Sequence, residues 1–540
     1  MTEPPCTVGL VPDAPVRQVP LGQRKAKLGA LEDALGLVVQ SLPGGGEERP
    51  GQAQMADAVA TALATGRHLI VQAGTGTGKS IAYLVPIVMS GKRVVVATST
   101  KALQDQLAHK DLPILRAALG QRFSYAVLKG RSNYLCRQRA SELVNGDDAV
   151  DDRASARVPG ESDRHLFASG TDTDAPSTGG LVEELRRLLS WAEETDTGDR
   201  ADLSFEPGAR AWAMVSVGPR ECPGAFRCPS GHSCFAEAAR AKAAAADIVV
   251  VNTHLYGAHL ASDGSVLPEH DAVVFDEAHE LEDVMTASLG TELSPGRFRA
   301  LAALARPLVG ADSAQLVDDV VDVAERLQSA LEDRIGARVL GDQGDQGDRV
   351  VGSLSDGGSD DSRARDEQLD VVLSLAAGRL DRLTPRLHQG DREQGALFNV
   401  TDGVRPRAQV AAAHLAEDLG RFAARTAGEV AWVDGVRRAP TLRLSPIDVG
   451  PPLAARLWGQ TTAVLTSATI PPRMSQRVGL DAFGVEELDV SSPFDYRNNA
   501  LLYVPRHLPD RRRAESEPAI HDELDALIRA AGGRTLALFT

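Results

Sequence analysis

A glycine-rich segment that ends in Lys79 and Ser80 has the composition and spacing of a phosphate-binding loop, although it begins with alanine where the usual pattern has glycine. Its glycines allow successive backbone N–H groups to turn toward an anion. The lysine would supply a positive charge for the β- and γ-phosphates, and the serine hydroxyl would bind Mg²⁺. A flexible glycine turn is the alternative, but the apolar run 68–72 before it and the helical pattern after it favour a nucleotide loop. The segment comprises Ala73, Gly74, Thr75, Gly76, Thr77, Gly78, Lys79 and Ser80.

A second apolar run, 272–275, ends in the adjacent acids Asp276 and Glu277, and His279 follows two positions later. Carboxylates at the carboxyl end of a parallel strand lie where α/β sheets place catalytic groups. In that position Asp276 would hold Mg²⁺, and Glu277 would orient or deprotonate an attacking water. Solvated acids at a strand end are the alternative, but the phosphate loop in the same chain favours the catalytic interpretation.

Four of the five cysteines are candidates for a metal site. The last three follow a C-x5-C-x5-C spacing, and the proline and glycine residues between them favour a loop that wraps around one centre. This spacing matches neither a zinc ribbon nor a ferredoxin, so it does not distinguish zinc from iron–sulfur, and unrelated buried thiols remain an alternative. In a zinc site His232 could replace the first cysteine, whereas Cys6 is left over. The four candidates are Cys136, Cys222, Cys228 and Cys234.

Aromatic and basic residues flank these cysteines. Trp191 and Trp212 are more typical of a packed core than of platforms for nucleic-acid bases. Lys129, Arg131 and Arg137 are candidate contacts to nucleic-acid phosphates, although a solvated surface explains them almost as well.

The composition is that of a globular protein, with 43% hydrophobic and 24% charged residues among 540. At roughly 150 residues per domain, this length predicts three or four domains. No apolar run approaches the ~18 residues of a membrane span, and the first residues lack a signal-peptide pattern, so we expect a cytoplasmic protein without membrane contact. The formal net charge of −16 excludes nonspecific coating of nucleic acid, so DNA would need a local basic groove.

Short apolar runs that alternate with helical patterns predict the elements that position these residues. Such alternation indicates an α/β fold with a parallel sheet, interrupted here by two inserted modules. Segments 145–180 and 341–367 are polar and acidic, and we expect both to be disordered loops, whereas the rest of 284–430 has helical periodicity. The predicted strands are 68–72, 93–97, 247–251, 272–275 and 462–465.

Together, these motifs resemble those of superfamily-2 helicases, in the branch of XPD/DinG-like iron–sulfur helicases. The resemblance rests on the phosphate loop, on the sequence FDEAH at 275–279 and on LTSAT at 465–469. The stretch 49–55, with Arg49 and Gln52, resembles the adenine-reading motif of one branch. The stretch 98–107 resembles the next motif, which grips the DNA backbone.

The resemblance implies an ATP-dependent DNA helicase that moves 5′→3′ in repair or replication conflicts, as a monomer on single-stranded and tailed or structured duplex DNA. Its cofactors would be ATP, Mg²⁺ and a [4Fe–4S] cluster. Lys79, Ser80, Asp276 and Glu277 would form the ATPase core. His279, Ser467 and Thr469 would couple hydrolysis to DNA movement. Because 129–136 resembles the segment bearing the first cluster ligand, the four cysteines would hold the cluster and fix their module as a wedge beside the DNA.

The same resemblance predicts a RecA-like motor domain with an iron–sulfur insert and a mainly helical arch insert, followed by the start of a second RecA-like domain. Because 532–540 resembles the first motif of that second domain, we expect this chain to lack most of it and to fail as a motor by itself. The expected divisions are an N-terminal extension 1–45, motor domain 46–115, cluster insert 116–245, motor domain 246–283, arch 284–430, motor domain 431–475 and second motor domain 476–540.

Two alternative functions were weighed against a helicase. An ATP-binding scaffold for DNA structures, with little turnover, would share the phosphate loop and the cysteine module. A nuclease–helicase fusion would need an acidic metal-binding domain before Gln52, where the chain has too few residues.

Overall fold

The computed structural model describes residues 21–47, 49–120, 123–144, 178–339, 359–389, 401–490, 492–510, 513 and 515–538. The chain divides into two compact units, Met1–Ser491 and Ser492–Thr540. Among the described residues, no helix combines the length and apolar composition needed to cross a bilayer.

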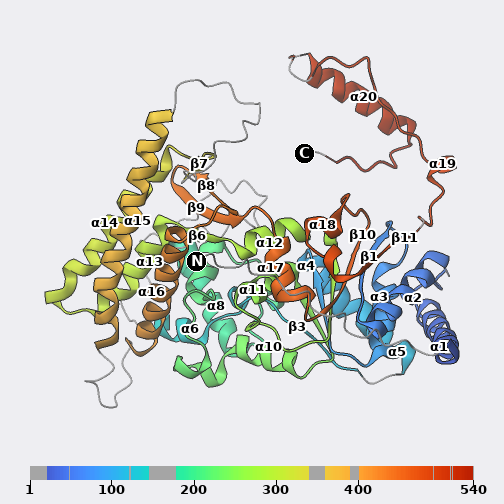
Figure 1. Ribbon diagram of the computed structural model, residues 1–540, viewed down its shortest axis with the longest axis horizontal. Helices are drawn as coiled ribbons and strands as arrows, with labels where there is room; N and C mark the ends of the chain where they lie inside the picture. Colours follow the sequence, from blue (N-terminus) through green and yellow to red (C-terminus); the bar gives the residue numbers. More distant parts are fainter. Residues whose placement is uncertain are drawn as a thin grey trace, which may run out of the picture. The chain divides into compact units, whose positions relative to one another are not determined.

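A seven-stranded parallel sheet forms the centre of the first unit, in the order β11-β1-β10-β5-β2-β4-β3 (Figure 1). This sheet confirms the α/β class. Five of the strands were predicted from their apolar runs, whereas β3 and β11 are less buried and carry a weaker signal. The strands are β1 (His68–Ala73), β2 (Val94–Thr98), β3 (Tyr125–Val127), β4 (Ile248–Asn252), β5 (Ala272–Asp276), β10 (Thr462–Ser467) and β11 (Val485–Val490).

Helices cover both faces of this sheet, which explains why its central strands read as continuous apolar runs. In β2, Val94 and Val96 face the first helical layer, whereas Val95 and Ala97 face the second. The first layer contains α1 (Leu21–Gln40), α2 (Pro50–Thr65), α3 (Lys79–Ser90) and α5 (Leu112–Leu119). The second layer contains α10 (Phe235–Ala244), α11 (Thr253–Ala261), α12 (Leu281–Leu289) and α17 (Gly450–Leu453).

The cysteines lie in a separate small module with its own apolar core. Trp212 is 4% exposed and donates from its indole nitrogen to the Ser132 carbonyl at 2.7 Å, while Trp191 packs at the edge of the same core. Trp212 is therefore a core residue, and the partly buried Trp191 packs against this core. The loop predicted at 145–180 ends before 180, because a helix begins at Thr178. Residues 145–177 lie outside the described residues. The main helices of this cysteine module are α6 (Arg137–Val144), α8 (Thr178–Glu194) and α9 (Ala209–Val215).

The second insert, here called the helical module, packs four helices against an antiparallel sheet in the order β6-β9-β8-β7 (Figure 1). This sheet was not predicted, and the module was expected to end at 430. Instead, alternate side chains of its last two strands, such as Val433 and Leu442, are buried against the helices, so the module continues to Pro446. Its elements are α13 (Pro295–Ala305), α14 (Ala314–Glu332), α15 (Ser359–His388), α16 (Thr401–Ala423), β6 (Thr291–Leu293), β7 (Arg338–Val339), β8 (Glu429–Val436) and β9 (Ala439–Pro446).

Two further expectations differ from the structure. The expected loop 341–367 is helical from Ser359, and its earlier part lies outside the described residues. Residues 476–490 were assigned to a second domain, but β11 pairs in parallel with β1 over six residue pairs and so belongs to the first sheet.

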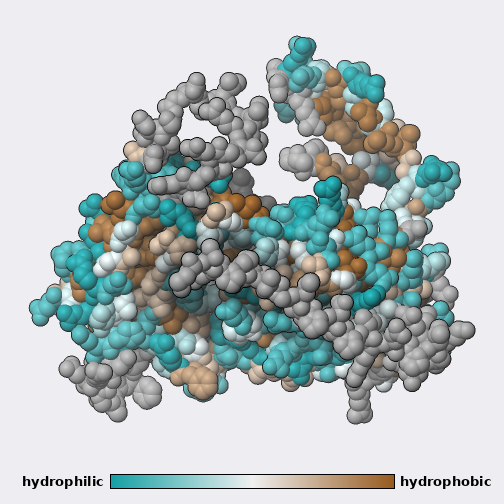
Figure 2. Space-filling view, in the orientation of Figure 1, coloured by the Kyte–Doolittle hydropathy of each residue, from teal (hydrophilic) through white to brown (hydrophobic). Residues whose placement is uncertain are grey.

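The second unit contains α19 (Tyr496–Asn499) and α20 (Ser516–Ala530). Within the segment 532–540, residues 534–538 form no helix or strand as far as Leu538, the last described residue, and Leu536 is 85% exposed. Figure 2 shows hydrophobic side chains on the surface of this unit, where Leu501 and Leu502 are 92% and 88% exposed.

Candidate active site and cysteine pocket

Three neighbouring strand ends bring the predicted catalytic residues to one edge of the sheet. Strand β10 lies between β1 and β5, with Gln72 paired to Ser467 and Thr466 paired to Asp276. The phosphate loop after β1, the acids after β5 and the LTSAT segment at the end of β10 therefore meet at the carboxyl edge, where α/β sheets bind ligands.

The phosphate loop leads directly into α3, whose first residue is Lys79. Thr77 is buried, and its hydroxyl donates to the Gly74 carbonyl at 2.7 Å. Ala73 ends β1 without a positive φ, so the first position of the loop does not require glycine here. Lys79 Nζ donates to the Ala73 carbonyl at 3.3 Å and lies 3.6 Å from Glu277 Oε1. The structure thus brings the lysine to the carboxylate that was predicted to be catalytic.

Arg49 and Gln52 support this loop from α2. Arg49 donates a hydrogen bond to the Gly76 carbonyl, and the buried Gln52 donates from Nε2 to the Gly78 carbonyl at 3.1 Å. Gly78 has a φ of +80°, and a Cβ placed there would lie 2.2 Å from Gln52 Nε2. The motif therefore contacts the loop backbone, while its contact with adenine remains a prediction.

Asp276 is 4% exposed at the end of β5. Burial and the charge of Glu277 raise the pKa of Asp276 to about 6. Its carboxylate accepts hydrogen bonds from the Tyr83 hydroxyl at 3.0 Å and from the Glu277 backbone N–H at 3.1 Å. Glu277 adopts a left-handed conformation with φ of +59°, which costs an L-residue about 1 kcal/mol.

Two site residues were missed at the sequence level. Tyr83 lies one helical turn after Lys79, a spacing that places both residues on one face of α3 and could have indicated its role. Asp111 is 5% exposed, and burial raises its pKa, whereas hydrogen bonds from Gln106 and Ser80 act in the opposite direction. Ser80 thus lies among buried polar groups close to the loop.

A hydrogen-bonded cluster joins Glu277 to the end of β10. Ser467 Oγ donates to Glu277 Oε2 at 3.0 Å, and His279 Nδ1 lies 2.8 Å from the same hydroxyl. A hydroxyl has one proton, so His279 donates to Ser467 when Ser467 donates to Glu277. Thr469 takes part through its backbone N–H, which lies 3.4 Å from Ser467 Oγ.

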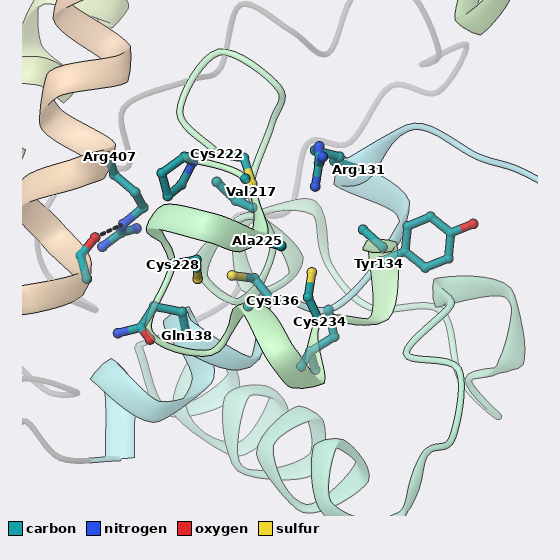
Figure 3. A pocket seen from close by; sticks show the side chains of 16 residues that line it. Arg131, Tyr134, Cys136, Gln138, Val217, Cys222, Ala225, Cys228, Cys234 and Arg407 are labelled. Carbon is teal, nitrogen blue, oxygen red and sulfur yellow. Dashed lines mark hydrogen bonds between the residues drawn. The ribbon is translucent and has the colours of Figure 1, made fainter. Parts of the chain in front are cut away.

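The four predicted cysteines line a single pocket, and all four are free thiols (Figure 3). Burial raises the pKa of Cys136, and burial together with the neighbouring thiols raises the pKa of Cys228 to about 11. A bare thiolate is therefore disfavoured in this pocket unless a cationic metal group compensates its charge. Within the described ranges, no three His, Cys, Asp or Glu side chains converge closely enough to mark a metal site.

The pocket nevertheless suits a larger group with four thiolate ligands. Arg131 lines it, and the buried Nη1 of Arg131 has no hydrogen-bond partner in the described part of the chain. Such a donor fits an anionic group inside the pocket. His232 is exposed and does not line the pocket, so the zinc alternative that uses this histidine loses its support.

The predicted phosphate contacts beside the pocket are engaged within the chain. Lys129 Nζ lies 2.7 Å from Asp199 Oδ2, and Arg131 pairs with Glu237. The Arg137 guanidinium lies 4.2 Å from the centre of the Phe235 ring. These interactions position the cysteine module, and the phosphate contacts remain predictions.

Comparisons with known proteins identify relatives of this chain. A family model described as DEAD/DEAH box helicase matches residues 49–144. The chain is 35% identical over 530 residues to the ATP-dependent helicase DinG of Mycobacterium tuberculosis, covering 95% of this chain and 74% of that protein. It is 31% identical over 524 residues to the ATP-dependent DNA helicase YoaA of Escherichia coli, covering 94% and 73%. A solved XPD helicase aligns over 89% of this chain and 70% of that chain, at 14% identity and a TM-score of 0.41. The chain therefore belongs to the DinG/YoaA family of ATP-dependent helicases.

Proposed function

We propose that this helicase hydrolyses ATP to move 5′→3′ along single-stranded DNA and to separate tailed or structured duplexes. The setting would be DNA repair or replication conflict, and the protein would act as a cytoplasmic monomer. The observation that carries the proposal is the hydrogen bond between Glu277 and Ser467, which joins the carboxylate beside the phosphate loop to the strand end next to it.

The contacts of the site support distinct roles for its residues. Lys79 and the loop amides would bind the β- and γ-phosphates, Ser80 and Asp276 would hold Mg²⁺, and Gln52 beside Arg49 would contact the adenine. Bound Mg²⁺ would neutralise charge on the phosphates. Lys79 lies 3.6 Å from Glu277, so a γ-phosphate that attracts the lysine would release this carboxylate. Glu277 would then accept a proton from the attacking water.

Ser467 and His279 are proposed as coupling residues. Both contact Glu277 Oε2, with Ser467 Oγ at 3.0 Å and His279 Nδ1 at 3.3 Å. A shift of the LTSAT segment when DNA binds would therefore change the position and basicity of the catalytic carboxylate. Coupling of this kind would make hydrolysis depend on DNA.

We infer that Cys136, Cys222, Cys228 and Cys234 hold a [4Fe–4S] cluster. Support comes from the shared pocket, the four-thiolate donor set and the unpartnered Arg131 nitrogen. The cluster would cross-link the loops of the cysteine module and keep it rigid beside the DNA.

Three measurements test the proposal. Strand displacement on duplexes that carry either a 5′ or a 3′ single-stranded tail should require ATP and the 5′ tail; dependence on the 3′ tail would overturn the polarity. Anaerobically purified protein should absorb broadly at about 400 nm and contain iron and sulfide. A colourless, iron-free protein would overturn the cluster. The third measurement is phosphate release with and without DNA. ATP binding without DNA-stimulated turnover would support the scaffold function instead.

A further inference from the structure

Arg407 of α16 reaches into the pocket that the four cysteines line, although it belongs to the helical module. Its side chain is only 6% exposed. Figure 3 shows Arg407 and Arg131 on either side of the thiols, so the pocket receives one arginine from each module.

The carboxylate that pairs with Arg407 is that of Glu142. The Nη2 of Arg407 donates to Glu142, and its Nε donates to the Gly403 carbonyl at 3.4 Å. Glu142 is also buried and lies on α6, the helix that follows Cys136 directly. A buried ion pair thus joins the helical module to the segment that carries the first cysteine.

The second contact between the modules is built on the loop that holds the other three cysteines. Arg227 donates to Gln409 of α16, and Gln409 donates to the Leu387 carbonyl at 3.0 Å. The hydroxyl of Ser230 donates to Gln138 at 2.8 Å, and Gln138 donates to Glu142, the partner of Arg407, at 3.1 Å. Any rearrangement of this loop would therefore be transmitted to α16.

Among the described residues, two arginines and no carboxylate line the pocket. Arg131 and Arg407 line it, whereas their carboxylate partners Glu237 and Glu142 do not. Arg139 lies behind Cys136 and is itself 3.8 Å from Glu221. A cluster with four thiolate ligands carries net negative charge, which two inward-facing cations stabilise strongly in a poorly solvated site.

We propose that Arg407 is a counter-charge for the cluster, supplied by the helical module, so that the presence and charge of the cluster set how firmly α16 docks on the cysteine module. This proposal rests on the proposed [4Fe–4S] cluster. Loss of the cluster would leave Arg407 with Glu142 alone, and α16 would loosen. Reduction adds negative charge and would tighten the contact, so Arg407 would also favour the reduced cluster.

The test compares Arg407→Gln with Arg405→Gln in anaerobically purified protein. Arg405 lies on the same helix, donates to the Leu387 carbonyl at 3.2 Å and does not line the pocket, so both variants remove one charge from α16. Iron content and absorbance first establish that each protein carries the cluster. The midpoint potential should become more negative in Arg407→Gln and stay unchanged in Arg405→Gln, while Arg407→Lys should recover part of the shift.

Hydrogen exchange of α16 is the second readout. In the wild type, removal of the cluster with a chelator should accelerate exchange in α16, and Arg407→Gln should exchange fast even when loaded. If Arg407→Gln misfolds because Glu142 is left unpaired, the neutral double variant Arg407→Gln/Glu142→Gln takes its place, with the same expectations. Wild-type potential and wild-type exchange in an iron-loaded variant would overturn this proposal alone. An iron-free wild type would overturn the cluster and this proposal together.

Discussion

The hydroxyl of Ser467 donates a hydrogen bond to Glu277 Oε2 at 3.0 Å, although the two residues are 190 positions apart. Parallel pairing of β10 with β5 creates this contact, because it aligns Thr466 with Asp276 and brings the residues that follow them together. The carboxylate that would activate water is therefore contacted by a neighbouring strand as well as by His279 of its own segment.

Replacing Ser467 with alanine should leave ATP affinity unchanged but reduce DNA-stimulated hydrolysis about 10-fold, because a hydrogen bond to a charged group of ~1.5 kcal/mol is lost. Thr466→Val is the matched control: this neighbouring hydroxyl is buried without a hydrogen-bond partner among the described residues. Steady-state phosphate release with and without single-stranded DNA measures both variants. Equal losses in Ser467→Ala and Thr466→Val would contradict a specific role for Ser467.

Gly78→Ala should weaken ATP binding about tenfold, or ~1.4 kcal/mol, because the new Cβ would lie 2.2 Å from Gln52 Nε2 and displace the loop. Gly91→Ala is the control, since Gly91 also has a positive φ of +64° but has no atom within 4 Å of the added Cβ. Both variants carry the strain of a left-handed alanine, roughly 1 kcal/mol, so their difference isolates the contact with Gln52. Titration with a fluorescent ATP analogue measures the affinities. Equal affinities of the two variants would show that Gln52 does not support the phosphate loop at Gly78.

The candidate residues at the carboxyl edge of the central sheet could be predicted because each lies in a motif that is contiguous in the sequence. Each candidate residue follows an apolar strand of the sequence, and parallel pairing collects such strand ends on one side. Tyr83 escaped prediction because a tyrosine in an apolar helix looks like any core residue until Asp276 is placed opposite its hydroxyl.

The modules were harder to delimit, for a physical reason. Strands β8 and β9 belong to the helical module because β9 pairs with β6 and β8 pairs with β7, contacts that span more than 90 residues and leave no local trace. The pairing of Arg407 with Glu142 is equally remote in sequence, so the link between the two modules emerges only from the fold.

Stability of the first unit should fall as the pH drops from 7.5 to 5.5. Burial and the nearby His270 lower the pKa of His259 from 6.5 to about 4. Between these values the unfolded chain binds a proton that the folded protein does not, so acid favours unfolding. Burial lowers the pKa of His270 as well, which acts in the same direction.

Urea titrations at the two pH values measure this effect. His259→Gln should reduce the pH dependence of the midpoint, whereas His109→Gln, which changes an exposed histidine, should retain the full dependence. An unaltered pH dependence in His259→Gln would assign the effect to other groups.

Cys228→Ser should abolish the absorbance at about 400 nm and make the cysteine module more sensitive to proteases, because a closed metal site contributes directly to local folding. Cys6 is not one of the four predicted ligands, so Cys6→Ser should retain both iron and protease resistance. ATP affinity should be the same in both variants, since the phosphate loop lies on the central sheet. Full iron content in Cys228→Ser would remove this residue from the ligand set.

We propose that Glu277 activates water in an ATP site that Lys79 and the phosphate loop build. Single-turnover hydrolysis of γ-labelled ATP, with protein in excess and single-stranded DNA present, tests it most directly. We expect Glu277→Gln to bind ATP as the wild type does and to hydrolyse it about 10²-fold more slowly, whereas Lys79→Ala should lose binding as well. Hydrolysis by Glu277→Gln at the wild-type rate would contradict the account.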